Sequence, residues 1–283
     1  MIPAAFDYTR VDTVDEAVQA LGQHGEDAKV LAGGHSLIPL LRLRMAFPSA
    51  LVDVGRVDEM RGVHDDGDQL VIGAATTHDE VQHDELVRQH CRVISEVVSH
   101  VGDPQVRNRG TFGGGIAHGD PAGDLPALAL ALDATMVVAG SGGRREVPAS
   151  EFFVDYLQTA LGPDDVLVEI RVPKLGSGWG YDYQKFNRVA QAWAIVGSLA
   201  LVRRDNGAIG EARVGLTHMG TVPLRAGQTE QALVGASPDA IGDACDLAAE
   251  ETSPPEDLNA RADYRRHLAR VLTRRAVENA LGG

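Results

Sequence analysis

Apolar residues recur at helical spacing in the first part of the chain, between short apolar runs that are typical of strands. The segment Val14–His24 has the helical period, and Thr13 with Glu16 three residues later forms a capping box in front of it. Gly25, directly after this segment, is a common helix end. The neighbouring pattern predicts two strands and a helix between them, at Lys29–Ala32, Ala50–Val54 and Ser36–Arg44.

The pattern next predicts a hairpin and a long helical region. An Asp-Gly pair in Asp65–Asp68 is a hairpin signal between the strand-like runs Arg61–His64 and Gln69–Gly73. Thr77 and Glu80 form a second capping box, which opens helical sequence through about His100. The rest of this half predicts a glycine-rich loop without regular helix, a helix and two paired strands, at Gly102–Gly123, Leu125–Leu132, Thr135–Ala139 and Arg144–Val147.

The pattern changes character near Pro173–Gly180, where we place a domain boundary at about residue 176 and read Gly176–Gly180 as a linker. Beyond it, three alternating segments predict an antiparallel meander, at Tyr181–Arg188, Ala194–Arg203 and Ala208–Met219. The remainder is predicted to be helical, with helices at Pro238–Ala249 and Ala260–Ala280. We expect the charged residues of Arg261–Arg275 to form a solvated face. The chain therefore predicts an α/β domain followed by a smaller α+β domain.

Composition restricts the function classes. The chain has 283 residues with 44% hydrophobic and 23% charged residues, which is ordinary for a globular protein. Its formal net charge of −14 disfavours nucleic-acid binding, because phosphate contacts need clustered Lys and Arg. No apolar run reaches the length of a membrane span, and the first residues lack the pattern of a secretion signal, so we expect a cytoplasmic protein.

Metal and thiol chemistry is not predicted. Cys91 and Cys245 are the only cysteines, whereas an iron–sulfur cluster needs about four thiolates. His78 and His83 are five residues apart, which puts them on different helix faces, and we expect no metal site there. We expect both cysteines to be inert.

Two glycine-rich loops carry the candidate chemistry. In the first, Ala32–Ser36, a strand leads into two glycines and a polar pair before a predicted helix, an arrangement whose backbone N–H groups can bind an anion. On the residues alone, an anion site and a plain strand-to-helix turn are equally well supported. In the second, Thr111–Gly115, three consecutive glycines again offer backbone donors, and Asp120 and Asp124 could accept hydrogen bonds from ligand hydroxyls. A mobile surface linker is the alternative for this second loop.

Two such loops far apart in sequence suit a ligand with two phosphates held between two lobes. Neither loop has the Gly-x-Gly-x-x-Gly spacing of a dinucleotide fold, and no P-loop motif is present. The ligand is therefore predicted to bind by a different arrangement of backbone donors.

With these two loops, the sequence resembles the FAD-carrying medium subunits of the molybdenum hydroxylase (xanthine dehydrogenase / carbon monoxide dehydrogenase) family. The resemblance covers essentially the whole chain, in the right order, and its motifs stand at Ala32–Ser36 with Pro39 and Leu41–Arg44, Ile72–His78, Arg107–Gly115, Asp120–Asp124, Lys185 with Phe186, and Ala192–Gly197. It implies an α+β fold: a two-lobed FAD-binding domain of the vanillyl-alcohol-oxidase (PCMH) type at residues 1–175, and a small C-terminal domain with an antiparallel sheet and helices at residues 176–283. Phe112, Gly115 and Trp193 depart from the residues common in the family.

The resemblance also implies a set of FAD contacts. No residue is implied as catalytic, because the chemistry is that of the flavin. The residues that match family contacts are Lys29, Val30, Leu31, Ala32, Gly33, Gly34, His35, Ser36, Leu37, Ile38, Thr76, Thr77, Val101, Gly102, Gly110, Thr111, Gly113, Gly114, Gly115, Ala117, His118, Asp120, Asp124 and Lys185. Lys185 would lie near the isoalloxazine edge, where a cation favours the anionic reduced flavin, and Trp193 would cover the flavin face. The alternatives are a surface lysine at a strand end and a core aromatic.

The function implied by the resemblance is electron transfer within a complex. A small subunit with two [2Fe–2S] clusters and a large subunit with a molybdenum cofactor would be the partners, as a dimer of heterotrimers, and this chain would pass electrons from the clusters through FAD to an external acceptor. A stand-alone flavin oxidase and a non-catalytic nucleotide-binding module are the alternatives. Carbon monoxide, aldehydes and N-heterocycles are all open as substrates of the complex, the acceptor is open as well, and Arg107 and Arg109 could pair with the iron–sulfur partner or with local carboxylates.

Overall fold

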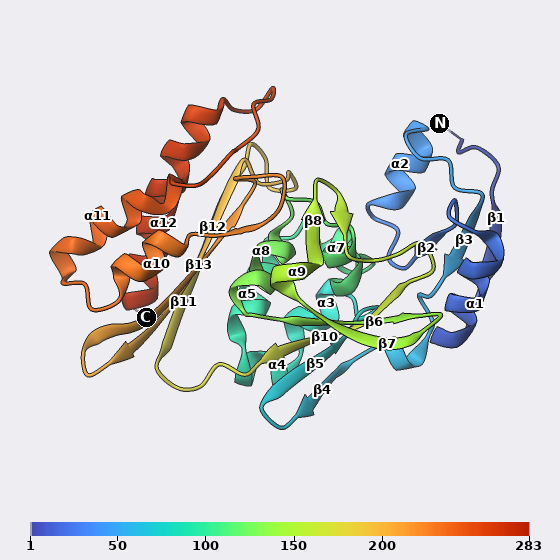
Figure 1. Cartoon of the computed structure of the whole chain (residues 1–283), viewed down its shortest axis with the longest axis horizontal. Helices are drawn as coiled ribbons and strands as arrows, with labels where there is room; N and C mark the ends of the chain where they lie inside the picture. The colour runs from blue at the N-terminus through green and yellow to red at the C-terminus, as the bar shows by residue number, and fades with distance from the viewer. Residues whose placement is uncertain (1, 283) are drawn as a thin grey trace.

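A small parallel sheet forms the first lobe, at residues 7–53. The computed structural model describes residues 2–282 and places this lobe at one end of an elongated molecule (Figure 1). Its strand order is β1-β3-β2, with β3 parallel to both neighbours. The elements of the lobe are β1 (Asp7–Arg10), α1 (Val14–His24), β2 (Lys29–Leu31), α2 (Leu37–Leu43) and β3 (Ala50–Asp53), and a 3-10 turn, η1 (Asp58–Met60), follows it.

The predicted start and end of α1 are confirmed. The Thr13 hydroxyl accepts a hydrogen bond from the N–H of Glu16 at 3.2 Å, and Gly25 ends the helix with a φ of 77°. The Glu16 carboxylate accepts from the N–H of Asp12 and not from that of Thr13, so only half of the predicted capping box forms. One buried face of the helix packs onto β3.

A five-stranded antiparallel sheet forms the second lobe, in the order β4-β5-β10-β6-β7. Its strands are β4 (Val63–Asp66), β5 (Gln69–Gly73), β6 (Thr135–Gly140), β7 (Gly143–Pro148) and β10 (Val166–Pro173), with a separate short pair, β8 (Phe153–Asp155) and β9 (Gln158–Thr159). The helices are α3 (His78–His83), α4 (Glu85–His90), α5 (Arg92–Ser99), α6 (Pro104–Arg107), α7 (Phe112–Ala117), α8 (Asp124–Ala131) and α9 (Ala149–Phe152). The helical region that begins at Thr77 is thus three short helices, because Asp84 ends α3 and its side chain caps α4.

The expectation that Gly102–Gly123 contains no regular helix is wrong. Asp103 caps α6 by accepting from the N–H of Val106, and Thr111 caps α7 by accepting from the N–H of Gly114. Phe112 and Ile116 are fully buried on the inner face of α7. Capping and burial of these two apolar side chains outweigh the poor intrinsic helix propensity of three glycines.

A four-stranded antiparallel sheet, in the order β11-β12-β13-β14, forms a third unit. Its elements are β11 (Trp179–Phe186), β12 (Val196–Asp205), β13 (Ala208–Thr217), β14 (Leu224–Arg225), α10 (Gly227–Leu233), η2 (Pro238–Ala240), α11 (Ile241–Asp246), η3 (Leu247–Ala249) and α12 (Ala262–Gly282). The predicted meander is confirmed. The predicted helix at Pro238–Ala249 is three short pieces, and the predicted linker loses Trp179 and Gly180 to β11.

Both faces of this sheet are covered, by α12 on the outer side and by α8 of the second lobe on the inner side (Figure 1). Leu199 and Leu201 of β12 point into the core that the two lobes share, whereas Ala200 and Val202 join a second core under α12. This two-sided burial explains why β12 is apolar at consecutive positions instead of alternating. Within residues 2–282, no helix is both long and apolar enough to cross a membrane.

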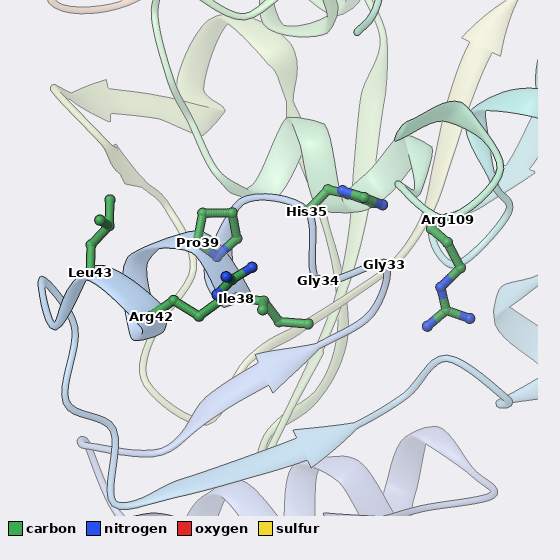
Figure 2. Close-up of a pocket in the computed structure, with 8 residues that line it drawn as sticks. All are labelled: Gly33, Gly34, His35, Ile38, Pro39, Arg42, Leu43 and Arg109. Carbon is green, nitrogen blue, oxygen red and sulfur yellow. The ribbon is translucent and has the colours of Figure 1, made fainter. Parts of the chain in front are cut away.

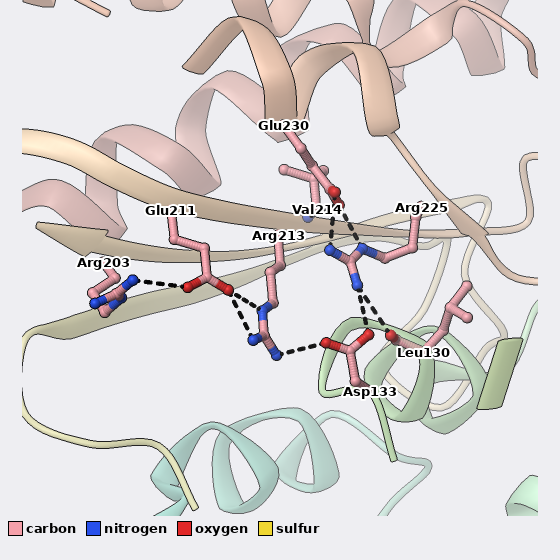
Figure 3. A network of polar contacts seen from close by, with 8 residues as sticks. All are labelled: Leu130, Asp133, Arg203, Glu211, Arg213, Val214, Arg225 and Glu230. Atoms are coloured by element: carbon pink, nitrogen blue, oxygen red, sulfur yellow. Dashed lines mark hydrogen bonds and ion pairs between the residues drawn. The ribbon is translucent and has the colours of Figure 1, made fainter. Parts of the chain in front are cut away.

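A chain of charged side chains ties the rim of the third unit to the end of α8 (Figure 3). Asp133, which follows α8, accepts from Arg213 at 3.0 Å and from Arg225 at 3.1 Å. Arg225 is held in turn by Glu230, and Arg213 by Glu211. Because Asp133 is 59% exposed, these pairs fix the orientation of the two units more than they stabilise them.

Arg265 contradicts the expected solvated face of the last helix. Its side chain is fully buried, donates to the Ile195 carbonyl and pairs with Asp257 at 2.8 Å. Although burial opposes it, hydrogen bonds from the backbone of Ala260 and Asn259 and the guanidinium of Arg265 lower the pKa of Asp257 to about 2. Arg265 lies three, four and seven positions before Leu268, Ala269 and Leu272, so the helical period places it on their buried face.

We predict that Arg265→Ala lowers the free energy of unfolding by about 3 kcal/mol, because it leaves a buried carbonyl without its donor and opens a cavity. Urea denaturation of the full chain measures the change. Arg275→Ala on the same helix is the control, because Arg275 is exposed, and it is expected to change stability by less than about 0.5 kcal/mol. Equal stabilities of the two variants would contradict the structural role of Arg265.

Candidate functional site

The two glycine loops meet backbone against backbone. A Cβ atom on Gly33 would lie 2.7 Å from the Cα of Gly110 and would overlap the carbonyl of Arg109. Gly34 has a φ of +78°, in the left-handed region that favours glycine. The first loop can therefore approach the second this closely only because Gly33 lacks a side chain.

The first loop offers open backbone donors. In the part of the chain that the structure describes, the N–H groups of Gly33, Gly34, His35 and Ser36 have no hydrogen-bond partner. The Ser36 side chain makes no capping bond to α2, so its hydroxyl is also available. Consecutive amides that include a left-handed residue and precede a helix form a concave anion site. The predicted chemistry of the first loop thus has a matching geometry.

The glycine donors of the second loop are already used within the protein, which corrects the expectation that they are free, and among its described N–H groups that of Thr111 alone has no partner. The N–H of Phe112 donates to the Thr76 carbonyl at 2.9 Å, and that of Gly113 to the Ala74 carbonyl at 3.0 Å. The N–H of Gly114 donates to the Thr111 hydroxyl at 3.2 Å. A Cβ on Gly113 would overlap Ala74, so this glycine permits close packing. The second loop forms a rigid platform for the first.

The segment before α3 completes this platform. The N–H of His78 donates to the Gly110 carbonyl at 2.9 Å, next to a β-bridge between Thr77 and Thr111. The Thr76 hydroxyl bonds to the backbone of Gly62, and the Thr77 hydroxyl caps α3. Both threonine side chains therefore fix the segment before α3, whose backbone pairs with the second loop.

A cavity of about 540 Å³ opens beside the first loop (Figure 2). Its lining combines glycine backbone, apolar side chains and arginines, contributed by Gly33, Gly34, His35, Ile38, Pro39, Arg42, Leu43 and Arg109. Among the described residues, neither Arg42 nor Arg109 forms an ion pair with a carboxylate. The cavity therefore presents unneutralised positive charge next to an anion-binding loop.

Arg107 and Arg109 have different roles, although the sequence gives them equal weight. The guanidinium of Arg107 donates to the carbonyls of Ser99 and Val101, both at 3.1 Å. It thereby fixes the turn that carries Val101 and Gly102, whose φ is +54°. Arg109 is exposed and lines the cavity.

Lys185 and Asp124 form a buried ion pair at 2.8 Å, with both side chains 4% exposed. Lys185 also donates to the His100 carbonyl, and the Tyr183 hydroxyl donates to the other Asp124 oxygen at 2.6 Å. Burial raises the pKa of the Asp124 carboxyl, against the charge and hydrogen bonds of Lys185 and the bond from Tyr183. Lys185 is thus no surface lysine, and its charge is balanced. Both Asp124 oxygens have protein partners, which corrects the expectation that they are open to ligand hydroxyls.

Trp193 is 52% exposed, so it is not a core aromatic. Its ring lies 6.4 Å from that of His118, measured between centroids, and His118 in turn lies beside Asp120. Burial lowers the pKa of His118, against the charge of Asp120. The remaining predicted contacts lie around the loops: Lys29, Val30 and Leu31 in β2, Ala32 after it, Leu37 and Ile38 in α2, and Gly115 and Ala117 in α7.

His78 is a residue that the sequence analysis did not place in the site. It is 4% exposed, and its Nδ1 has no partner among the described residues. Burial, and then the nearby charges of His35 and Arg107, lower its pKa to about 4. Its position directly after Thr76 and Thr77 was the available signal.

The chain is similar to known proteins over both of its parts. Residues 4–175 match the family model described as the FAD binding domain in molybdopterin dehydrogenase, and residues 181–280 match that of the CO dehydrogenase flavoprotein C-terminal domain. The chain belongs to the FAD-binding medium subunits of the molybdenum hydroxylases. It is 40% identical to the carbon monoxide dehydrogenase medium chain of Hydrogenophaga pseudoflava, over 99% of this chain and 98% of the relative.

Other relatives are named after different compounds. The 6-hydroxypseudooxynicotine dehydrogenase complex subunit alpha of Paenarthrobacter nicotinovorans is 34% identical, over 99% of this chain and 96% of the relative. Carbon monoxide dehydrogenase from H. pseudoflava lacking the Mo-pyranopterin moiety superposes with a TM-score of 0.97 at 42% identity, over 100% of this chain and 99% of that one. Quinoline 2-oxidoreductase from Pseudomonas putida 86 superposes with a TM-score of 0.95 at 32% identity, with the same coverage. The predicted family, α+β fold class and FAD cofactor are confirmed.

The site fits FAD on its own evidence. Four free amides stand where a pyrophosphate needs donors, and the neighbouring cavity has apolar walls for a ring system. No group of three or more metal-ligating side chains occurs in residues 2–282, and burial raises the pKa of the thiols of Cys91 and Cys245 to about 12.

We predict that Gly33→Ala weakens FAD binding at least about tenfold, or about 1.4 kcal/mol, because a Cβ pushes the two loops apart. Fluorescence titration with FAD measures the change. Gly22→Ala is the matched control, because a Cβ there meets nothing within 4 Å and α1 tolerates alanine. If both variants bind FAD as the unchanged protein does, the close contact is not needed for the site.

We further predict that His78 makes the ligand-free chain less stable in acid. Its folded pKa of about 4 lies below the ordinary 6.5, so the unfolded chain takes up a proton that the folded chain does not. The stabilisation is fully present above pH 6.5 and falls by about 3 kcal/mol as the pH drops to 4. Urea denaturation across this range should show a shallower decline for His78→Asn, and His83→Asn, on the exposed side of the same helix, should retain the original slope.

Proposed function

We propose that this chain passes electrons from iron–sulfur clusters on a partner subunit, through its bound FAD, to an external acceptor. The observation that carries the proposal is a site built for FAD in a chain with two buried cysteines, which cannot ligate clusters itself. FAD, when bound, can accept and release electrons one or two at a time. The chain's own residues bind and orient the cofactor.

The proposed contacts follow from the geometry. The free amides of Gly33–Ser36 bind the pyrophosphate, and Arg109 adds a cation beside it. The cavity along α2 takes the adenosine end, against Ile38 and Pro39. The second loop, Gly110–Gly115, supports the first loop by backbone packing.

The flavin end is assigned to the side of the third unit. The buried pair of Asp124 and Lys185 joins the start of α8 to β11, and we propose that the flavin ring lies beside it. Trp193, which is exposed and rests near His118, covers a ring face in this arrangement. The balanced charge of Lys185 then orients the ring by hydrogen bonding more than it stabilises a reduced anion.

The division into residues 1–175 and 176–283 is also kept as a proposal. The two matched family models, at 4–175 and 181–280, support it. The sheet of the second part closes the core of the first, so we propose that the two parts act as one cofactor-binding unit.

An iron–sulfur small subunit and a molybdenum-cofactor large subunit are the proposed partners, in a dimer of heterotrimers in the cytoplasm. The names of relatives, which are a medium chain and a subunit of a complex, support the presence of partner subunits. At the end of α2 and directly after it, Leu43, Met45 and Phe47 are 59%, 69% and 65% exposed, and large exposed apolar side chains that gather together mark interaction sites. We propose that a partner subunit covers them. Carbon monoxide, aldehydes and N-heterocycles stay open as substrates.

We predict that this chain, co-produced with its two partner subunits, purifies as a complex containing FAD and iron. When the complex is reduced by carbon monoxide, an aldehyde or an N-heterocycle, electron paramagnetic resonance should detect reduced clusters and the flavin absorbance should bleach. Clusters that become reduced while the flavin stays oxidised would contradict the proposed route.

The double variant Met45→Asp/Phe47→Asp, at residues outside the cavity lining, should lower the recovery of the partners at least about tenfold, because the charges cannot be buried in an interface. Val234→Asp is the control, because Val234 is a similarly exposed apolar residue in the third unit, after α10.

A further inference from the structure

His218 is bonded both to the segment that carries Trp193 and to the turn that follows α7. It comes directly after β13, and its Nδ1 lies 2.7 Å from the carbonyl oxygen of Ala194, the residue next to Trp193. Its backbone N–H donates to the Pro121 carbonyl, also at 2.7 Å. One residue of the third unit therefore links these two segments.

The turn that accepts the bond from the His218 N–H also carries the neighbours of Trp193. The Nε2 atom of His118 lies 4.0 Å from a carboxylate oxygen of Asp120, the residue before Pro121. The ring centroids of His118 and Trp193 are 6.4 Å apart. Both rings are thus attached to His218 through the segments that carry them.

The backbone of His218 has a conformation that a histidine rarely adopts. Its φ is +63°, in the left-handed region. Such strain persists where the surrounding structure fixes the residue, and it occurs most often at functional sites. The bonds from the N–H and from Nδ1 fix His218 from two directions. A glycine would remove the strain, but it would also remove the imidazole donor.

The contacts of Nδ1 determine which nitrogen of the His218 ring carries the proton. The Ala194 carbonyl can only accept, so Nδ1 carries the proton and donates it. Nη1 of Arg265 lies 3.0 Å from the same nitrogen and, being a donor itself, adds no hydrogen bond there. Burial lowers the pKa of His218, and the positive charge of Arg265 acts in the same direction, against the hydrogen bond to Ala194. The ring is therefore neutral, with its proton directed at Ala194.

We propose that His218 is a positioning residue for the flavin site, which holds Trp193 over the ring face through the bond from its Nδ1–H to the Ala194 carbonyl. This inference rests on the proposed placement of the flavin ring beside Asp124 and Lys185, with Trp193 over it. The bonded carbonyl belongs to the residue next to Trp193, so a shift of this carbonyl changes the direction of the indole. Trp193 is itself 52% exposed, so packing alone does not hold its ring.

The test compares His218→Gly with His218→Asn in the full chain with FAD bound. Glycine adopts the left-handed backbone and lacks the donor, whereas asparagine tolerates this backbone and carries an amide donor near the position of Nδ1. An indole over the flavin quenches flavin fluorescence, so His218→Gly should raise the fluorescence of bound FAD most of the way to the level of Trp193→Ala. His218→Asn should return it toward that of the unchanged chain. The affinity for FAD should fall by no more than about tenfold, the effect of one hydrogen bond.

Asn206→Gly is the matched control, because Asn206 lies before the other end of β13 and has a φ of 51°. Its fluorescence should equal that of the unchanged chain. The double variant Trp193→Ala/His218→Gly should fluoresce as Trp193→Ala does, because His218 acts through the indole. A further rise in the double variant would show a merely structural role and contradict the proposal, as would unchanged fluorescence in His218→Gly.

A second readout does not depend on the flavin. In the nitrogen NMR spectrum of the chain with ¹⁵N-labelled histidine, the His218 signals are identified by their loss in His218→Asn, and Nδ1 should carry the proton. A proton on Nε2 alone would overturn the proposal, because the bond to Ala194 would not exist. Unchanged fluorescence in Trp193→Ala would overturn the flavin placement, and this inference with it, even with the proton on Nδ1. A failure of the placement is therefore distinguishable from a failure of His218 to position the indole.

Discussion

The contact between Gly33 and the backbone of Arg109 and Gly110 is the constraint on which the site depends. Two chain segments more than seventy residues apart approach so closely that the first cannot carry a side chain at Gly33. The approach is possible because the second segment is rigid: its amides are paired with Ala74, Thr76 and Thr111, and it therefore gives the first loop a fixed surface. The amides of the first loop stay free because this support comes from backbone packing and leaves its donors unused.

The sequence predicted most of the elements, since capping residues and hydrophobic period are local signals. Thr13, Thr77 and the strand pattern after residue 178 placed elements where the structure has them. Family resemblance led to the cofactor, the fold class and the residues around the loops. The inference from glycine content to absence of helix at Phe112–Ala117 failed, because the local cap at Thr111 was overlooked and the burial of Phe112 and Ile116 depends on residues distant in sequence.

The roles of charged residues were the part that the sequence could not supply. The helical period places Arg265 on the face of Leu268, but it does not show the partners, Ile195 and Asp257, that allow its charge to be buried. Arg107 and Arg109 are two positions apart, yet Arg107 donates hydrogen bonds to backbone carbonyls and Arg109 lines the cavity. A charge finds its role through its distant partners, and those partners become visible only when the chain is folded.

The strand β12 has a consequence for how this protein can evolve. Its two faces belong to two different cores, one built from the lobes that hold the cofactor and one built under α12. The C-terminal segment therefore contributes to the core of the FAD-binding domain as well as forming a core of its own. A recombination event that exchanged this segment between relatives would have to bring along matching residues of α8, such as Ala127 and Ala131, against which Gly215 packs. For this reason, we expect the two segments that match separate family models to have been inherited together.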